Sequence, residues 1–183
     1  TLLQLFERRH SAATRRGRAV TSGPRTSRAM ARAWFSSSTS SARGGFEDGM
    51  SPLELTNAYT SFNDGNYQPA RAIIKVTDQK GEVLYKWNDN SKEIWNKSTV
   101  AKMRQLLHET TLSGTARKAY FPTDYIGGKT GTTNDVKDMW FVGLTANYTT
   151  GVWIGRDKPS NLQSIYSHTP HVLIWKDISQ TAE

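Results

Sequence analysis

The 183-residue sequence contains no cysteine, which excludes disulfide bonds and thiolate metal sites. It has no apolar run near the ~20 residues that a membrane-spanning helix needs, and TLLQLF at the start is too short for a signal peptide. Only 36% of the residues are hydrophobic, and the shortage is not spread evenly. Length and composition together predict one domain, or one domain with a tail.

Acidic residues are almost absent from the first quarter of the chain. Residues 1–44 contain nine arginines and one acid, Glu7, whereas residues 45–183 hold fifteen basic and fifteen acidic side chains. The net charge of +8 therefore belongs to residues 1–44 alone. The same segment has no Lys, Asp, Asn, Ile or Tyr, all of which are frequent afterwards. So abrupt a change indicates a change of reading frame or a foreign segment.

Residues 1–44 are predicted to be a disordered or aberrant Arg/Ser-rich segment, because their arginines mark no helix face and no motif. The alternative is a basic-arm binding module for nucleic acid or another anionic polymer. We expect the ordered domain to span residues 45–183, and we expect no nucleic-acid partner.

A helix is predicted at the start of that domain. Ser51 is a suitable N-cap, Pro52 suits the first helical position, and Glu54 completes a capping box. Apolar residues follow at helical spacing until Asn63-Asp64-Gly65, which should end the helix.

A hairpin and a second helix are predicted next. Residues 72–87 alternate apolar and polar side chains around a turn at 78–81, as the two arms of a hairpin do. Residues 98–113 form a helix that starts at Ser98. Its apolar face holds Val100, Met103, Leu106 and Leu107.

Three strand-like runs follow, at residues 125–133, 139–145 and 150–157, and a last short helix is expected at 172–180. The linkers between the runs are too short for crossover connections, so the strands should form an antiparallel meander. The sequence therefore predicts an α+β fold, in which helices pack on an antiparallel meander.

The first of these strands carries the candidate site. Lys129 supplies a cation, and Thr130 and Thr132 supply hydroxyl groups. Gly131 has no side chain, so a ligand backbone can lie against this edge. Alternate residues of a strand share a face, which places Lys129 and Gly131 on one face and the threonines on the other. These groups suit a peptide carboxylate, although an ordinary strand with a surface lysine has the same pattern.

Two further patterns indicate no cofactor and no metal ion. The stretch GGKT resembles the end of a phosphate-binding loop, but Thr123 stands where that motif needs its first glycine. His168 and His171 flank a proline without any metal-ligand spacing, so we predict two surface-loop histidines.

The sequence contains, in this order, the blocks SPLELTNAYTSFNDG, LSGTARKA, KTGTTN, DMWFVG, GVWIG and VLIWKDI. Together they resemble the penicillin-binding transpeptidase domain, whose family is known for a Lys-Thr-Gly element. The resemblance covers about residues 45–180 and is closest to the bifunctional class A enzymes that build bacterial peptidoglycan.

The resemblance implies a role for each matched residue. Lys129 would order the hydrogen bonds around the catalytic groups and attract the substrate carboxylate. Thr130 and Thr132 would bind the carboxylate of a D-Ala-D-Ala stem peptide or of a β-lactam, along the edge that Gly131 leaves bare. The backbone N–H of Thr132 would form one side of the oxyanion hole. Lys129 and Thr132 are thus the expected catalytic residues.

The nucleophile of this family is absent from the sequence. The family's serine stands in Ser-x-x-Lys, where the lysine one helical turn on takes the hydroxyl proton. No serine here has Lys three residues on; Ser22 and Ser40 have arginine there, which stays protonated. Ser61-Phe62-Asn63 matches the second motif, Ser-x-Asn, but lies where the family has packing residues. We predict a chain that is truncated or frame-shifted upstream of residue 51, and that is inactive alone because it lacks the attacking serine.

Family resemblance further implies the C-terminal part of a penicillin-binding/β-lactamase-like fold. It implies work outside the cytoplasm, with a stem peptide or β-lactam as ligand, and attachment to the membrane only through an anchor missing from this sequence. Trp140 and Trp153 are expected to be core residues, and Asp138 a residue of a turn or strand start.

Overall fold

The structure, a computed structural model, describes residues 50–183. The predictions made for the basic segment 1–44 lie outside the described residues.

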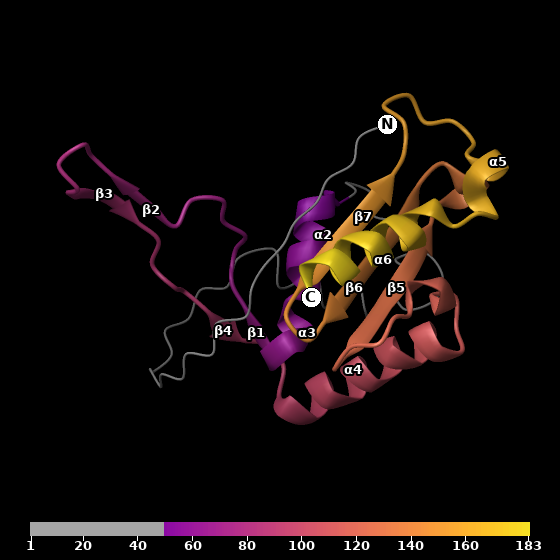
Figure 1. Ribbon diagram of the computed structural model, residues 1–183, viewed down its shortest axis with the longest axis horizontal. Coiled ribbons are helices and arrows are strands. Elements are labelled where there is room, and N and C mark those ends of the chain that lie inside the picture. The colour runs from indigo at the N-terminus through magenta and orange to yellow at the C-terminus, as the bar shows by residue number, and fades with distance from the viewer. Residues whose placement is uncertain (1–49) are drawn as a thin grey trace.

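A three-stranded antiparallel sheet lies at the centre of the described chain (Figure 1). Its strands are β5 (Ile126–Thr132), β6 (Met139–Thr145) and β7 (Thr149–Ile154), in the order β5-β6-β7. The predicted meander is confirmed, since the short linkers allow only hairpin connections. Within the described residues β5 is an edge strand, paired with β6 on one side only.

The first helix begins as predicted. Ser51 Oγ accepts from the N–H of Glu54 at 3.2 Å, and the Glu54 carboxylate accepts from the N–H of Ser51 at 2.9 Å. This capping box opens α2 (Pro52–Tyr59), and α3 (Ser61–Asp64) follows. Gly65 ends α3 with φ of 87°, a left-handed conformation that glycine adopts without strain.

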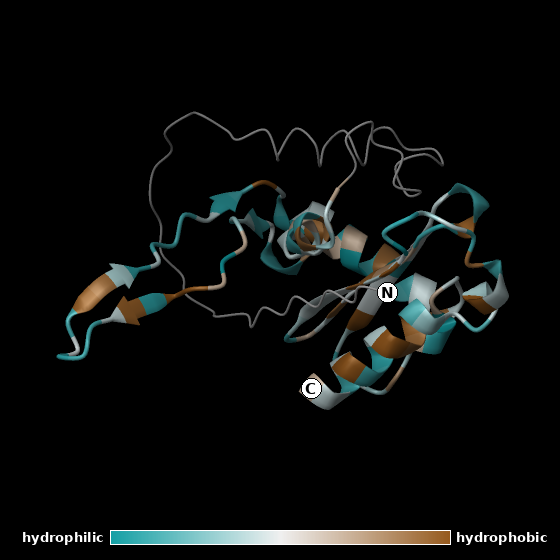
Figure 2. Ribbon diagram, turned by 90° about the horizontal axis from the view of Figure 1, so that it is seen from above, coloured by the Kyte–Doolittle hydropathy of each residue, from teal (hydrophilic) through white to brown (hydrophobic). Residues whose placement is uncertain are grey.

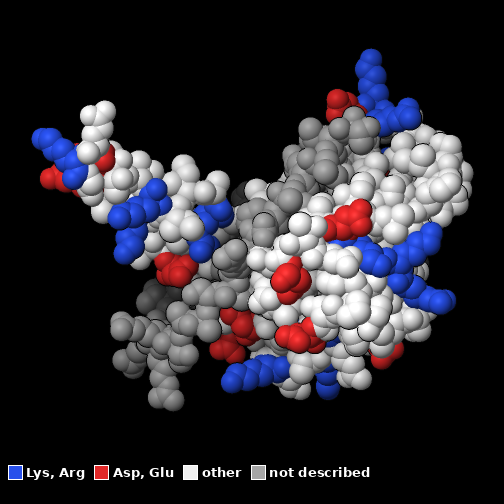
Figure 3. Space-filling view, viewed as in Figure 1, with Lys and Arg blue, Asp and Glu red and all other residues white. Residues whose placement is uncertain are grey.

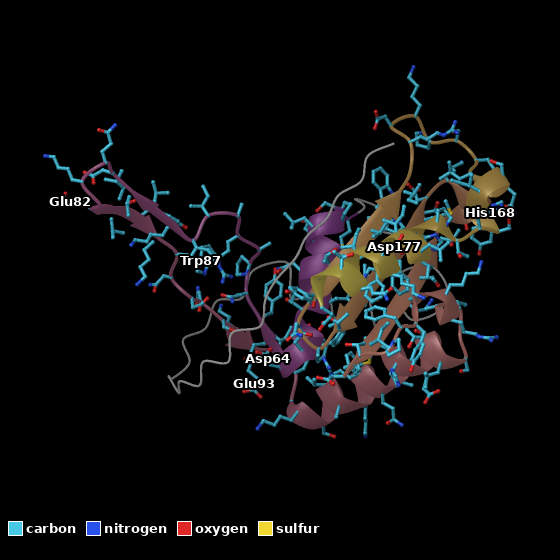
Figure 4. All side chains as sticks on the ribbon, viewed as in Figure 1. Asp64, Glu82, Trp87, Glu93, His168 and Asp177 are labelled. Carbon is cyan, nitrogen blue, oxygen red and sulfur yellow. The ribbon has the colours of Figure 1, made fainter. Side chains whose placement is uncertain are left out.

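The predicted hairpin is confirmed and projects from the body of the protein (Figures 1 and 2). It consists of β2 (Lys75–Thr77) and β3 (Val83–Lys86), and Asp78 accepts from two backbone N–H groups in its turn. At its base β1 (Asn66–Tyr67) pairs with β4 (Lys92–Glu93). Figure 4 labels Glu82 and Trp87 on the projecting part. Its apolar side chains are exposed: Ile73, Ile74, Val76, Val83, Leu84 and Tyr85.

The second helix differs in detail from the prediction. α4 (Lys97–Leu112) starts one residue before Ser98, because Asn96 is the N-cap and its Oδ1 accepts from the N–H of Thr99 at 2.8 Å. Leu106 was wrongly placed on the apolar face, since it is 60% exposed while Leu107 is buried. Adjacent residues lie 100° apart on a helix, so only one of this pair faces the sheet.

Helices cover both faces of the sheet. α2 lies on one face, where a Cβ on Gly151 of β7 would meet Thr56 Oγ1 at 1.9 Å. On the opposite face lies α6 (Pro170–Ala182), and a Cβ on Gly143 of β6 would meet the Trp175 ring at 2.5 Å. These two glycines let the helices approach the sheet closely. The α+β architecture is therefore confirmed for the described residues.

The last helix corrects the prediction for the two histidines. His168 is exposed, after the short helix α5 (Gln163–Tyr166), and Figure 4 labels it at that end of the molecule. His171 is not a loop residue: it lies in the first turn of α6 with 1% of its surface exposed. The sequence signal was misleading because Pro170 opens the helix at its first position instead of breaking it.

Candidate functional site

The register of the sheet decides which backbone groups of β5 face its open edge. The N–H of Thr145 in β6 bonds to Tyr148 O, on the β7 side, and Thr145 lies opposite Ile126 in β5. In an antiparallel ladder the direction of the backbone N–H and C=O groups alternates from residue to residue. The backbone groups of Ile126, and of every second residue after it, therefore point away from β6. Thr130 and Thr132 therefore present their N–H and C=O groups at the edge.

The first half of this edge is covered by α4. His108 Nδ1 lies 2.6 Å from Ile126 O, and a carbonyl oxygen only accepts, so that ring nitrogen carries the proton. Thr110 Oγ1 donates to Gly128 O. Past Gly128, the turn after α4 brings Thr115 to 2.8 Å from Thr130, hydroxyl to hydroxyl. Sequence reasoning missed these three residues, because the contacts span 15 to 18 positions of chain.

Lys129 is held over the open half of the edge. Its Nζ donates to Thr130 O at 2.8 Å, which brings the ammonium group from the α2 face round to the edge. Desolvation lowers the pKa of Lys129 from its usual value, although the residue is exposed overall. Among residues 50–183 the one ion pair joins Lys137 and Asp135, so Lys129 has no acidic partner there.

Gly131 plays a different part from the one predicted. The expected facing is confirmed: Lys129 and Gly131 pair with Val142 and Trp140, and the two threonines with Phe141 and Met139. However, the backbone groups of Gly131 point toward β6. The edge groups that a ligand can reach belong to Thr130 and Thr132.

The turn after the site is fixed by Asp138, which is a turn residue as predicted. Asp138 Oδ2 accepts from Thr133 Oγ1 at 3.0 Å, and its Oδ1 accepts from Trp153 Nε1 at 3.0 Å. Trp153 and Trp140 lie with ring centroids 6.0 Å apart, and both are half-buried, not core residues. The prediction that they belong to the core is therefore wrong.

Ser61-Phe62-Asn63 lies inside the protein. Ser61 is fully buried, donates to Ala58 O at 2.8 Å and accepts from Trp95 Nε1 at 3.1 Å. Asn63 Nδ2 donates to Thr149 Oγ1 at 3.1 Å. These contacts join α3 to its neighbours, as expected for packing residues.

No group of three or more metal-ligating side chains occurs within residues 50–183. In the same part of the chain, no helix is long and apolar enough to cross a membrane. Basic and acidic side chains are interspersed on the face that Figure 3 shows.

The fold is that of the transpeptidase part of penicillin-binding proteins of known structure. Penicillin-binding protein 3 of Mycobacterium tuberculosis has the same fold, with a TM-score of 0.58 and 20% identity over 73% of this chain and 34% of that chain. The penicillin-binding protein PonA1 of the same organism matches with a TM-score of 0.56 and 23% identity, over 68% of this chain and 37% of that chain.

The chain belongs to the family described as the penicillin binding protein transpeptidase domain, whose sequence profile matches residues 19–164. It is 53% identical over 142 residues to penicillin-binding protein 4 of Bacillus subtilis, covering 77% of this chain and 23% of that protein. It is 37% identical over 145 residues to penicillin-binding protein 1A of Clostridium botulinum, covering 78% of this chain and 17% of that protein. The chain thus spans less than a quarter of either relative. The match begins inside residues 1–44, and the boundary at 45 stays a prediction.

Proposed function

We propose that residues 45–183 supply the carboxylate-binding part of a peptidoglycan DD-transpeptidase domain, which acts outside the cytoplasm in cell-wall cross-linking. The observation that carries this proposal is the open edge of β5: Lys129 Nζ is held there by Thr130 O at 2.8 Å, with no acidic partner among the described residues. The ligand is the terminal carboxylate of a D-Ala-D-Ala stem peptide or the carboxylate of a β-lactam.

Each group of the edge has a task in this proposal. The ammonium group of Lys129 attracts the carboxylate, and its lowered pKa reflects a site where water screens the charge less. The hydroxyls of Thr130 and Thr132 donate to the carboxylate oxygens. The backbone N–H of Thr132 points outward from the open edge of β5. There it can stabilise an oxyanion, the negatively charged oxygen that forms during acyl transfer.

Lys129→Met is expected to weaken binding of acetyl-D-Ala-D-Ala to the full chain by about tenfold or more. A hydrogen bond to a charged group contributes about 1.5–3 kcal/mol, and 1.4 kcal/mol is a tenfold change in affinity. Titration followed by NMR would measure this, with the amide signals of Thr130 and Thr132 shifting in the unchanged protein.

Lys97→Met is the matched control, because Lys97 is an exposed lysine at the far end of α4 from the site. It should leave the affinity unchanged. Equal binding by Lys129→Met and the unchanged chain would contradict the proposal, as would shifts confined to the β2–β3 hairpin.

The chain alone is expected to take no covalent label from a fluorescent penicillin, because acylation requires the serine of Ser-x-x-Lys, which the sequence lacks. Without a nucleophile, a serine enzyme keeps only about 10³–10⁴-fold catalysis over water. Gel fluorescence after incubation, with mass spectrometry of any labelled peptide, tests this. A label on a serine of this chain would show that an unrecognised nucleophile is present.

The alternative, a basic arm for nucleic acid or an anionic polymer, rests on residues 1–44. Fifteen basic and fifteen acidic side chains balance in residues 45–183, so this part of the chain adds no net charge to such binding. Nucleic-acid binding of this kind would fall steeply with salt. No contact of the described residues favours it over the edge site.

A further inference from the structure

α4 and the turn after it occupy the edge of β5 in a regular series. Their side chains contact Ile126 O, Gly128 O and Thr130 Oγ1, which lie two residues apart along the strand. The series stops at Thr130, and the next outward-facing residue, Thr132, has no such contact among the described residues. The edge is therefore closed on one side of Thr130 and open on the other.

This closure limits what can pair with the strand. A ligand in extended form adds to an edge by bonding to its outward N–H and C=O groups. From Thr132 it would run toward Thr130, where it meets Lys129 Nζ and the hydroxyl of Thr115. A chain that continued would need the carbonyl groups that His108 and Thr110 already occupy. The ligand must end at this point.

The hydroxyls of Thr115 and Thr130 have one proton each, and only one of the two is used in the hydrogen bond between them. The other proton is free to be donated elsewhere. If Thr115 is the donor, the proton of Thr130 points outward and is given to the ligand. A carboxylate, which only accepts, satisfies that arrangement fully. A C-terminal amide has one acceptor oxygen instead of two, and its N–H₂ group cannot accept the proton of Thr130.

We propose that Thr115 is a positioning residue that selects ligands ending in a free carboxylate, by fixing the direction of the Thr130 hydroxyl and closing the edge behind it. This inference rests on the proposed function, and it adds the residue that orients the Thr130 hydroxyl toward the ligand carboxylate.

The test compares two probes, acetyl-D-Ala-D-Ala and its C-terminal amide, titrated into the full chain by NMR. Thr115→Val keeps the shape of the side chain and removes the hydroxyl. We expect it to weaken binding of the acid about fivefold, as for the loss of one hydrogen bond, and to change binding of the amide by less than about twofold. Thr115→Ser should restore binding of the acid, because it keeps the hydroxyl.

Ser113→Ala is the matched control, since Ser113 is an exposed hydroxyl near by whose bond goes to Glu109 O. It should leave both affinities unchanged. Thr115 is exposed, so the urea midpoint of Thr115→Val should equal that of the unchanged chain, which separates positioning from stability.

Three outcomes decide between the two proposals. Weaker acid binding by Thr115→Val, with restoration by Thr115→Ser, supports the positioning role. Unchanged discrimination between acid and amide in Thr115→Val overturns that role and leaves the proposed function standing. If the unchanged chain binds neither probe, the proposed function fails and the positioning role fails with it.

Discussion

Replacing Trp175 by alanine is expected to lower the free energy of unfolding by about 3–5 kcal/mol, the range found for large aromatic side chains in protein cores. Trp175 is fully buried on α6, and its ring lies 5.0 Å from that of Phe141 in β6, edge to face. Its Nε1 donates to Thr150 O in β7 at 3.0 Å. The substitution removes all of these contacts and leaves a cavity between α6 and the sheet.

The effect should reach the candidate site through the sheet. A Cβ on Gly128 would lie 2.6 Å from the Phe141 ring, so β5 lies directly against the ring that Trp175 supports. We expect the amide signals of β5 to broaden in Trp175→Ala before the protein unfolds in urea.

Two comparisons separate the causes of this loss. Trp175→Phe keeps an aromatic ring but leaves Thr150 O without its indole donor, and should cost about 1–3 kcal/mol. Leu173→Ala, on the same helix and 42% exposed, should cost far less. A loss below about 1 kcal/mol for Trp175→Ala, by urea unfolding followed by circular dichroism, would show that α6 does not hold the sheet as described.

Acid is expected to destabilise the protein through His171. Burial lowers the pKa of His171 from 6.5 to about 4, because the charged ring would lose its hydration. The unfolded chain then binds a proton at higher pH than the folded one. The contribution of neutral His171 to the free energy of unfolding is fully present above about pH 6.5 and falls as the pH drops toward 4. The whole loss amounts to about 3 kcal/mol.

The measurement is the free energy of unfolding in urea between pH 7.5 and pH 4.5, compared between the unchanged chain and His171→Leu. The difference isolates His171 from the carboxylates, which titrate in both proteins. Leucine also removes Nδ1, a buried atom without a hydrogen-bond partner in the described structure, so the variant should fold at pH 7.

His168→Gln is the control, since His168 is exposed and three residues away. It should keep the pH dependence of the unchanged chain. Parallel pH curves for His171→Leu and the unchanged chain would mean that His171 is protonated in the folded protein at no cost, contrary to its burial.

Much of the fold could be predicted from the sequence, because the signals are local. The capping box at Ser51, the turn at Asp78 and the hairpin connections of β5, β6 and β7 each depend on residues a few positions apart. The same holds for the facing of Lys129 and Thr130, which follows from the alternation of a strand. Most of the wrong predictions concern burial, as at Leu106 and His171.

By itself the sequence determined the order of the elements and the family, and it predicted the strand that carries the candidate site, since motif letters and short-range periodicity carry that information. Only the tertiary structure decided which backbone groups of that strand face the open edge, and that His108, Thr110 and Thr115 close half of it. Those contacts join segments 15 to 18 positions apart. Their geometry depends on how α4 packs on the sheet, which no local pattern encodes.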